Sequence, residues 1–220
     1  MMEELIHFSK QEIVEIGRRL YQKGLIVATE GNISVRIGEN TLLTTPQGIN
    51  KGFMTVDQIV TTDLNGVKLE GTWMPSSELK MHVAVYHARQ DVKAVVHAHP
   101  PVGTGFAVAG LALDKSVLPE VVVTLGAVPL VRYATPTTDA LAELVSHYIL
   151  TCDALLLANH GALTVGQDLL TAYHKMETLE QFAKITLVAR LLGQENTLSQ
   201  EDVDKLMEIR AQYLKRCSLT

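Results

Sequence analysis

The chain has 220 residues and a mass of 24.1 kDa, which is enough for one sizeable hydrophobic core. Its 19 Lys and Arg residues against 24 Asp and Glu residues give a net charge of −5, so it lacks the excess of basic residues typical of nucleic-acid-binding proteins. The longest weakly polar run, residues 100–113, contains glycine and proline and is shorter than the about 20 apolar residues of a membrane span. We therefore expect no nucleic acid and no membrane as a partner.

The start of the chain and its cysteines indicate the compartment. Residues 1–4 open onto a polar helical pattern, whereas a secretory signal needs a basic start followed by an apolar segment. The two cysteines, Cys152 and Cys217, give no disulfide framework. We expect a protein of the reducing cytoplasm.

The first half of the chain predicts one helix, three strands and a second helix. A capping box at 9–12 opens the first helix, and Gly24 closes it. Short β-rich runs separated by turns predict strands at 33–37, 41–45 and 59–63. A proline and two serines then precede a helical pattern from Glu78 to about Gln90.

The second half alternates buried strands and helices. Compact apolar runs predict buried strands at 92–99 and 153–159. Helical patterns cover 139–150 and 169–192, and a cap pattern at 199–202 opens a final helix. Because several strands are joined by short turns, we expect an α/β protein with a largely antiparallel sheet. With no repeat, linker or composition break, residues 1–220 are expected to form one domain.

Three of the eight histidines stand at the ends of the two buried strands. His97 and His99 are two residues apart and project to the same side, because successive side chains of a strand alternate. His160 follows the second strand, and we expect Gly161 after it to allow a tight turn. Three histidines with an open fourth position are typical of a catalytic zinc site. Spacing alone leaves open whether His160 reaches the pair, and a lone histidine at a strand end is more often hydrogen-bonded or exposed.

The other five histidines are interpreted as structural or surface groups. They are His7, His82, His87, His147 and His174.

Ser76 and Ser77 stand directly before the helix that starts near Glu78. Their hydroxyls, with the free N–H groups at a helix start, form an anion site in principle. The alternative is a plain helix cap, in which Glu78 only compensates the helix dipole.

Two polar turns could offer backbone amides to a phosphate: Gly31 with Asn32, and Gln47 with Gly48. Each is also a common hairpin signal. The glycines of 103–110 lack the spacing of a dinucleotide-binding loop, and we reject that interpretation.

These motifs together resemble the class II aldolase/adducin family, and within it the L-fuculose-1-phosphate aldolases. The resemblance covers nearly the whole chain, and the order of its five motifs is highly specific. The motifs are Gly31-Asn32-Ile33-Ser34, Thr45-Pro46-Gln47-Gly48, Pro75-Ser76-Ser77-Glu78, His97-Ala98-His99 and Asn159-His160-Gly161.

The resemblance implies a site and an assembly. Zinc, or another divalent ion, would be held by His97, His99 and His160 with Glu78 as fourth ligand. The implied fold is a three-layer α/β/α domain around a largely antiparallel sheet, usually in a C4 homotetramer with active sites at subunit boundaries. The implied phosphate-binding residues are Gly31, Asn32, Gln47, Gly48, Ser76 and Ser77.

The implied reaction is aldol cleavage of a ketose 1-phosphate. Zinc acts as a Lewis acid that stabilises the enediolate formed when the C3–C4 bond breaks. Glu78, displaced by substrate, acts as acid or base at the enediolate carbon. The products would be dihydroxyacetone phosphate and an aldehyde.

Departures from the motif pattern leave alternatives open. Tyr213 matches a C-terminal tyrosine that such aldolases place over a neighbour's site, but valine occupies the segment 119–123 where fuculose aldolases carry another tyrosine. Glu120 falls near the catalytic acid of dehydratases acting on methylthioribulose 1-phosphate.

Two further branches of the family fit this sequence less well. Sugar-phosphate epimerases usually have Asp at position 78, where this chain has Glu. A non-catalytic interaction module like adducin lacks the metal histidines.

Overall fold

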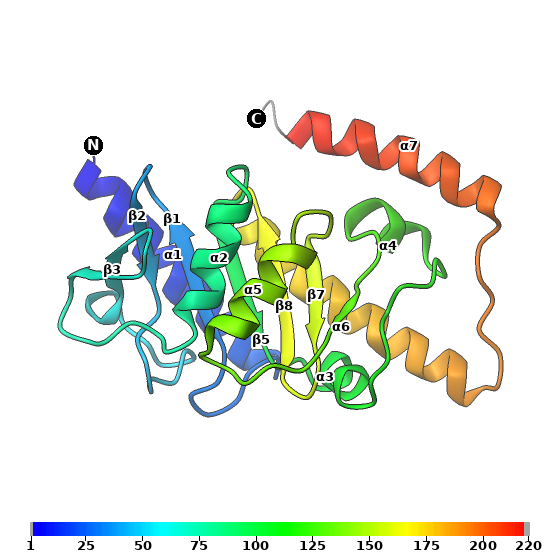
Figure 1. Cartoon of the computed structure of the whole chain (residues 1–220), viewed down its shortest axis with the longest axis horizontal. Coiled ribbons are helices and arrows are strands. Elements are labelled where there is room, and N and C mark those ends of the chain that lie inside the picture. Colours follow the sequence, from blue (N-terminus) through cyan, green and yellow to red (C-terminus); the bar gives the residue numbers. More distant parts are fainter. Residues whose placement is uncertain (1, 218–220) are drawn as a thin grey trace.

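An eight-stranded sheet forms the middle layer of the molecule (Figure 1). The structure is a computed structural model that describes residues 2–217, and side chains of residues 3–212. The sheet order is β4-β3-β2-β1-β5-β8-β7-β6, and every pairing is antiparallel except β6 with β7. The strands are β1 (Asn32–Arg36), β2 (Thr41–Thr44), β3 (Val60–Asp63), β4 (Lys68–Glu70), β5 (Ala94–Ala98), β6 (Leu130–Val131), β7 (Ala154–Leu157) and β8 (Gly161–Gly166).

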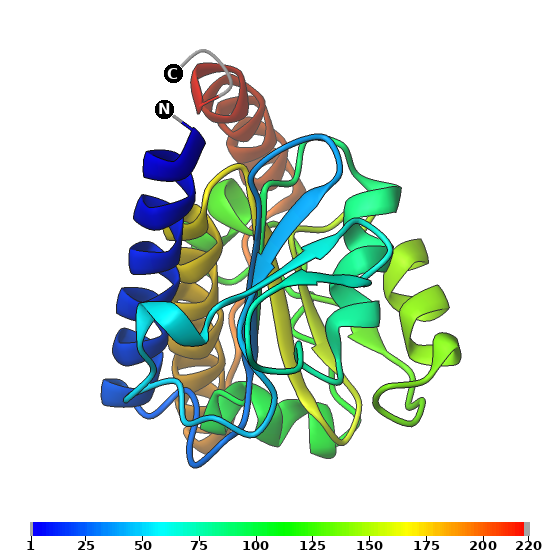
Figure 2. The same cartoon turned by 90° about the vertical axis from the view of Figure 1, so that its left-hand side faces the viewer.

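Helices cover both faces of this sheet, as Figure 2 shows. The helices are α1 (Met2–Gln22), η1 (Val56–Gln58), α2 (Leu79–Ala88), α3 (Pro101–Val108), α4 (Pro119–Thr124), α5 (Asp139–Tyr148), α6 (Leu169–Leu191) and α7 (Gln200–Cys217). The three-layer α/β/α arrangement around a largely antiparallel sheet confirms the predicted fold class.

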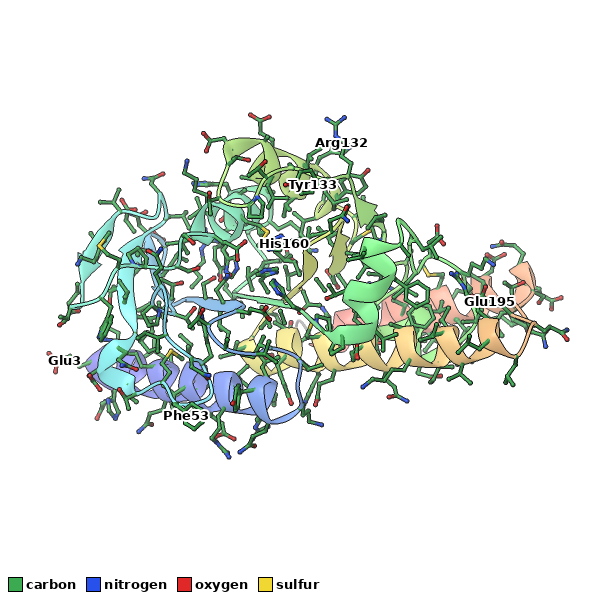
Figure 3. The ribbon with its side chains drawn as sticks, turned by 90° about the horizontal axis from the view of Figure 1, so that it is seen from below. Glu3, Phe53, Arg132, Tyr133, His160 and Glu195 are labelled. Carbon is green, nitrogen blue, oxygen red and sulfur yellow. The ribbon has the colours of Figure 1, made fainter. Side chains whose placement is uncertain are left out.

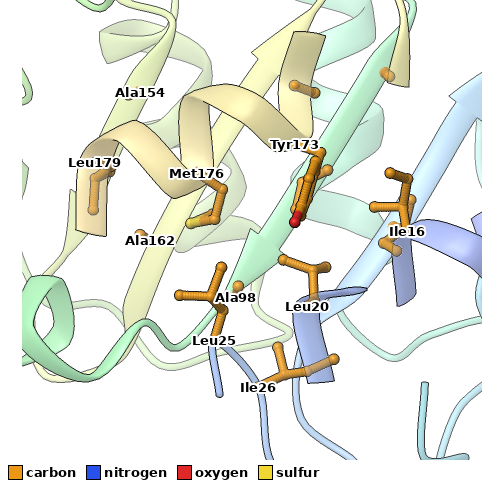
Figure 4. Close-up of a cluster of buried hydrophobic side chains, with 14 of the residues drawn as sticks. Ile16, Leu20, Leu25, Ile26, Ala98, Ala154, Ala162, Tyr173, Met176 and Leu179 are labelled. Carbon is orange, nitrogen blue, oxygen red and sulfur yellow. The ribbon is translucent and has the colours of Figure 1, made fainter. Parts of the chain in front are cut away.

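Two apolar cores lie on the two faces of the sheet. On β5, Val96 belongs to the core under α1 and α6, and its neighbour Val95 belongs to the core under α2 and α5. Figure 4 shows the first core, in which Tyr173 and Met176 of α6 and Leu20 of α1 lie over the sheet. Strand alternation thus divides the apolar residues between the two helical layers.

The first helix begins earlier than the sequence predicts. It starts at Met2, so Ser9 lies inside the helix and does not cap it. The prediction was wrong because Ile6, N-terminal to the expected cap, packs on the core and extends the helical face. The predicted end is confirmed, since Gly24 adopts a left-handed φ of 67° directly after the helix.

Helix α3 is one of several short elements that the sequence patterns miss. Its segment contains Gly103 and Gly105, which disfavour a helix. The buried carboxylate of Glu180 on α6 accepts hydrogen bonds from the N–H groups of Val102 and Gly103. This long-range cap stabilises the helix start, and no local pattern reports it.

No helix among residues 2–217 is both long and apolar enough to cross a membrane.

A cluster of ion pairs lies at the start of β7. Asp153, whose side chain is 10% exposed, contacts Arg89 at 2.6 Å, Lys175 at 3.0 Å and Arg210 of α7 at 3.6 Å. Burial alone would raise the pKa of Asp153, but Lys175 and Arg89 outweigh it and lower that pKa below its ordinary value. Asp153 therefore ties α2, α6 and α7 to the sheet.

We predict that Asp153→Asn lowers the free energy of unfolding by about 3–5 kcal/mol at pH 7, because buried cations lose their counter-charge. The pKa of Asp153 is lower in the folded than in the unfolded chain. Its stabilisation is therefore complete above the unfolded pKa and is lost as the pH falls through the folded pKa. Urea unfolding at a series of pH values should show the two proteins converging in acid.

Asp139→Asn is the matched control. Asp139 also pairs with a lysine, Lys80, but its side chain is 81% exposed. Its loss should change stability by less than about 1 kcal/mol. Equal effects of the two variants would contradict the assigned role of Asp153.

Candidate active site

The strand register brings the three histidines together at one end of the central strands. His97 on β5 lies opposite Asn32 of β1 and Leu163 of β8, and His99 follows one residue beyond the strand. His160 comes from the turn between β7 and β8 and points into the middle of the molecule (Figure 3). One ring nitrogen from each histidine lies within 4.8 Å of the other two. His97 is fully buried, and the side chains of His99 and His160 are 23% and 12% exposed.

Close backbone packing makes this approach possible. A Cβ on Gly161 would lie 2.5 Å from Cδ2 of His99 and 2.6 Å from the carbonyl of Ala98. The left-handed residue of the turn is Asn159, with a φ of 55°, and not the glycine after His160. Gly161 is therefore required for space rather than for its turn conformation, which corrects the reason expected from the sequence.

Gly31 is required both for its left-handed backbone conformation and for space. Its φ is 69°, and a Cβ there would lie 2.8 Å from the carbonyl oxygen of His97. The Gly31 turn can therefore lie directly against the strand that carries the histidines.

The Glu78 carboxylate faces the histidines from the start of α2. Its Oε1 lies 3.1 Å from Nε2 of His160, and its Oε2 lies 3.4 Å from Nε2 of His97. The side-chain amide of Asn32 donates to Oε2 at 2.9 Å. Burial alone would raise the pKa of Glu78, but the hydrogen bonds with His160 and with the Asn32 amide lower it below its ordinary value. The carboxylate is thus held ionised beside the imidazoles.

The donor set fits a divalent cation. His97 Nδ1 lies 2.9 Å from the carbonyl of Ala162, which can only accept, so the proton is on Nδ1 and Nε2 carries a lone pair. Nε2 of His99 lies 3.2 Å from Nε2 of His97. Ligand atoms about 2.0–2.1 Å from a tetrahedral zinc lie about 3.3 Å apart. The distance between the His97 and His99 nitrogens and the two distances from Glu78 oxygens to His160 and His97 fall close to that value. Burial lowers the pKa of His97 to about 3 and lowers that of His99, so both rings stay neutral and able to bind a metal.

The predicted phosphate-binding residues gather around the start of α2. An isolated bridge pairs Pro46 with Pro75, and the Ser76 N–H donates to the carbonyl of Thr45. This bridge places the Gln47-Gly48 turn beside Ser76 and Ser77, while Asn32 reaches Glu78 from β1. A Cβ on Gly48 would meet nothing within 4 Å, so open space adjoins that turn.

The two serines differ in their bonding. Ser76 Oγ accepts from the Glu78 N–H at 3.3 Å and so takes part in the cap that the sequence offered as the alternative. Within residues 3–212, the Ser77 hydroxyl has no hydrogen bond. A groove of about 970 Å³ between α2 and α5 borders both serines but is not lined by His97, His99 or His160.

Two sequence candidates, Glu120 and Tyr213, lie in α4 and α7, away from the strands that bring the histidines together. Tyr213 lies in α7, but its side chain is outside the described residues. Glu120 is exposed in the first turn of α4, and Val122, in the segment where a tyrosine was expected, is buried.

The sequence interpretation missed Glu30 and Lys51. Glu30 lies 3.4 Å from Nδ1 of His99 and so faces the nitrogen that points away from the cluster. Lys51 is 3% exposed, and its Nζ donates at 2.6 Å to the carbonyl of Thr29, in the loop before Gly31. Burial lowers the pKa of Lys51 to about 8, and the charge of Glu78 acts against that shift. The sequence signal that could have found Glu30 and Lys51 is their position close to the glycine motifs Gly31-Asn32 and Gln47-Gly48.

The family model "Class II Aldolase and Adducin N-terminal domain" matches residues 11–187. The chain belongs to the class II aldolase and adducin family. It is 38% identical to an L-fuculose phosphate aldolase of Methanococcus maripaludis, over 80% of this chain and 95% of the relative. A 3-oxo-tetronate 4-phosphate decarboxylase of Haemophilus influenzae is 34% identical over 80% and 85%, and a 5-deoxy-D-ribulose 1-phosphate aldolase of Bacillus thuringiensis 30% over 92% and 95%.

The solved structures agree with this assignment. An L-fuculose 1-phosphate aldolase superposes with a TM-score of 0.86 at 34% identity, covering 91% of this chain and 94% of that one. Family and relatives make this protein a sugar-phosphate aldolase, which is a lyase.

We predict that Gly161→Ala weakens zinc binding by about 10- to 100-fold, because its methyl group would displace His99 or the Ala98 carbonyl. Competition of the purified variant with a chromogenic chelator measures this. Gly105→Ala is the control, since a Cβ at that helical position meets nothing within 4 Å. Unchanged affinity in Gly161→Ala would mean that His99 is not a ligand.

Proposed function

We propose that the protein is a metal-dependent aldolase that cleaves a (deoxy)ketose 1-phosphate, such as L-fuculose 1-phosphate, to dihydroxyacetone phosphate and an aldehyde. The observation that carries the proposal is the largely buried Glu78 carboxylate, which contacts His97 and His160 of the three convergent histidines and lies next to the turns predicted to bind phosphate. This supports the proposal, because an acid–base group and a cation site within reach of one small substrate are what aldol cleavage requires.

His97, His99 and His160, with Glu78, would hold zinc or another divalent ion. Bound there, the cation supplies a Lewis acid that polarises the ketose carbonyl. Ala162 and Glu30 orient the rings of His97 and His99 for this task.

Glu78 moves the proton in this proposal. When the C3–C4 bond of the ketose breaks, the C4 hydroxyl releases its proton as the aldehyde carbonyl forms, and the electron pair of the broken bond stays on C3. The Glu78 carboxylate takes up one proton, which balances that release, and delivers it to C3. In the reverse direction the carboxylate removes that proton. The Asn32 amide holds Oε2 throughout and keeps the carboxylate aimed into the site.

The substrate phosphate binds around the start of α2 in this proposal. The Ser77 hydroxyl and the turns at Gly31 and Gly48 provide donors, with Asn32, Gln47 and Ser76 beside them. Lys51 adds a positive charge: among the described residues, no carboxylate lies within 4.0 Å of its ammonium. A buried ammonium with no carboxylate in contact favours a dianionic ligand nearby.

The zinc-loaded protein should release dihydroxyacetone phosphate from at least one of the 1-phosphates of fuculose, rhamnulose and 5-deoxyribulose. Glu78→Gln should lower kcat by about 10²–10⁴-fold, the usual contribution of a general acid or base. The wild type should also exchange a C3 proton of dihydroxyacetone phosphate for deuterium in the absence of aldehyde. No release from any substrate and no exchange would reject the proposal.

Lys51→Met should raise KM for the phosphorylated ketose about tenfold, equivalent to about 1.4 kcal/mol, with a smaller change in kcat. Inorganic phosphate should also inhibit this variant less than the wild type. Lys93→Met is the matched control, because Lys93 is exposed at the opposite end of β5. If both variants keep the wild-type KM, Lys51 takes no part in phosphate binding.

A second candidate reaction is decarboxylation of a 3-oxo acid phosphate, favoured by the decarboxylase relative at 34% identity. Loss of CO₂ from a 3-oxo acid leaves an electron pair on the carbon next to the carbonyl, as aldol cleavage does. Both reactions therefore need the same cation and the same acid–base group. Measuring CO₂ release from 3-oxo-tetronate 4-phosphate beside the aldolase assay decides between the two.

We also propose a homotetramer with active sites at subunit boundaries. The cluster supports this because His99 and His160 keep partly exposed side chains, which a neighbouring chain could cover. A large apolar end of α6, with Leu191 and Leu192 about four-fifths exposed, offers contact surface. Light scattering that gives the mass of one chain would reject the assembly.

We also propose a cytoplasmic location, which fits the metabolic relatives and which cell fractionation tests.

A further inference from the structure

One stripe of α2 is polar although the rest of its buried side is apolar. Glu78, His82 and Tyr86 are spaced by four residues and share one helix face. Opposite them, Asn32, Ser34 and Arg36 alternate along β1 and share one strand face.

These two faces are joined by hydrogen bonds, which we call the α2–β1 ladder. Its first contact joins Asn32 and Glu78 at 2.9 Å. Ser34 Oγ then lies 2.7 Å from Nδ1 of His82 and 2.9 Å from the Tyr86 hydroxyl, which also donates to the Ser34 carbonyl at 2.9 Å. The ladder ends where Arg36 donates to the Tyr86 carbonyl at 3.4 Å.

Only one assignment of protons gives each of the three middle contacts its own donor. The Tyr86 hydroxyl donates to the Ser34 carbonyl, the Ser34 hydroxyl donates to the Tyr86 oxygen, and His82 Nδ1 donates to Ser34 Oγ. His82 is therefore protonated on Nδ1, and its buried Nε2 has no hydrogen-bond partner. Burial lowers the pKa of His82 to about 4, which keeps this ring neutral.

The α2–β1 ladder fixes the position of α2 more strictly than apolar packing does. Ser34, His82 and Tyr86 are fully buried, so each lost hydrogen bond leaves an unpaired polar group away from water. Apolar contacts of the same helix, such as those of Val85, tolerate small rotations and shifts. Directional hydrogen bonds to β1 fix the rotation of α2 about its axis and its position along that axis, and Glu78 stands at the N-terminal end of that helix.

We propose that His82, supported by Ser34 and Tyr86, is a positioning residue that holds the Glu78 carboxylate at the three histidines through the α2–β1 ladder. The part of this inference that concerns catalysis rests on the proposed function. The part that concerns zinc binding does not depend on which substrate is cleaved.

The test compares three variants of the full chain. His82→Leu removes the ladder contact at similar volume, His82→Asn restores a side-chain donor, and Val85→Ala creates a cavity in the same buried helix away from the ladder. We expect His82→Leu to weaken zinc binding by about 10- to 100-fold and to lower kcat at zinc saturation by at least about tenfold, with KM within about twofold.

His82→Asn should recover most of both losses, while Val85→Ala should lower Tm but leave zinc affinity and kcat unchanged. If His82→Leu and Val85→Ala behave alike, the ladder is only structural and the proposal is wrong.

Two further measurements keep the proposal testable. If His82→Leu fails to fold, Tyr86→Phe, which removes one hydroxyl, replaces it. We expect Tyr86→Phe to lose zinc affinity and kcat to a smaller degree, and wild-type zinc affinity in this variant would overturn the proposal. Nitrogen-15 NMR of the wild type should show His82 in the Nδ1–H form, and an Nε2–H form would contradict the ladder. If no substrate is cleaved but zinc affinity and the NMR signature follow expectation, the proposed function fails and the positioning role stands.

Discussion

The close approach of imidazole nitrogens at one end of the central strands is the constraint on which the rest of this structure depends. Two ring nitrogens with their lone pairs turned inward lie 3.2 Å apart, and a carboxylate lies within 3.4 Å of one of them. Such an arrangement is stable where a cation neutralises it. The sheet register, the absence of a Cβ at Gly161 and the polar contacts of α2 all serve to keep these groups in place.

The site also explains how an acidic protein can bind an anionic substrate. A net charge of −5 describes the whole chain, whereas the proposed phosphate site involves only the groups around the start of α2. There the chain gathers amides, hydroxyls and the buried ammonium of Lys51, and the proposed cation lies close by. Electrostatic attraction is thus local, and the surface needs no basic patch.

Much of this could be predicted from the sequence, because the relevant signals are local. Two buried strands, one ending in His97 and His99 and the other followed by His160, predicted where the histidines meet. The cap at Ser199 and the stop at Gly24 were confirmed. The family motifs supplied what spacing could not, namely that His160 reaches His97 and His99.

What the sequence did not predict depends on contacts between distant segments. Helix α3 needs the carboxylate of Glu180, which lies 77 residues along the chain from Gly103. His82 resembled a background histidine because its role appears only when Ser34 of β1 faces it. Its spacing of four residues from Glu78 was the signal that pattern reading overlooked.

The central claim is that these side chains form one mononuclear metal site. X-ray absorption at the zinc edge, on metal-free protein titrated to saturation with zinc, tests it most directly. The account predicts one zinc ion per chain, with scattering from three imidazoles and at least one oxygen at about 2.0–2.1 Å. A spectrum dominated by water oxygens, or one that is the same after His97→Ala, would contradict it.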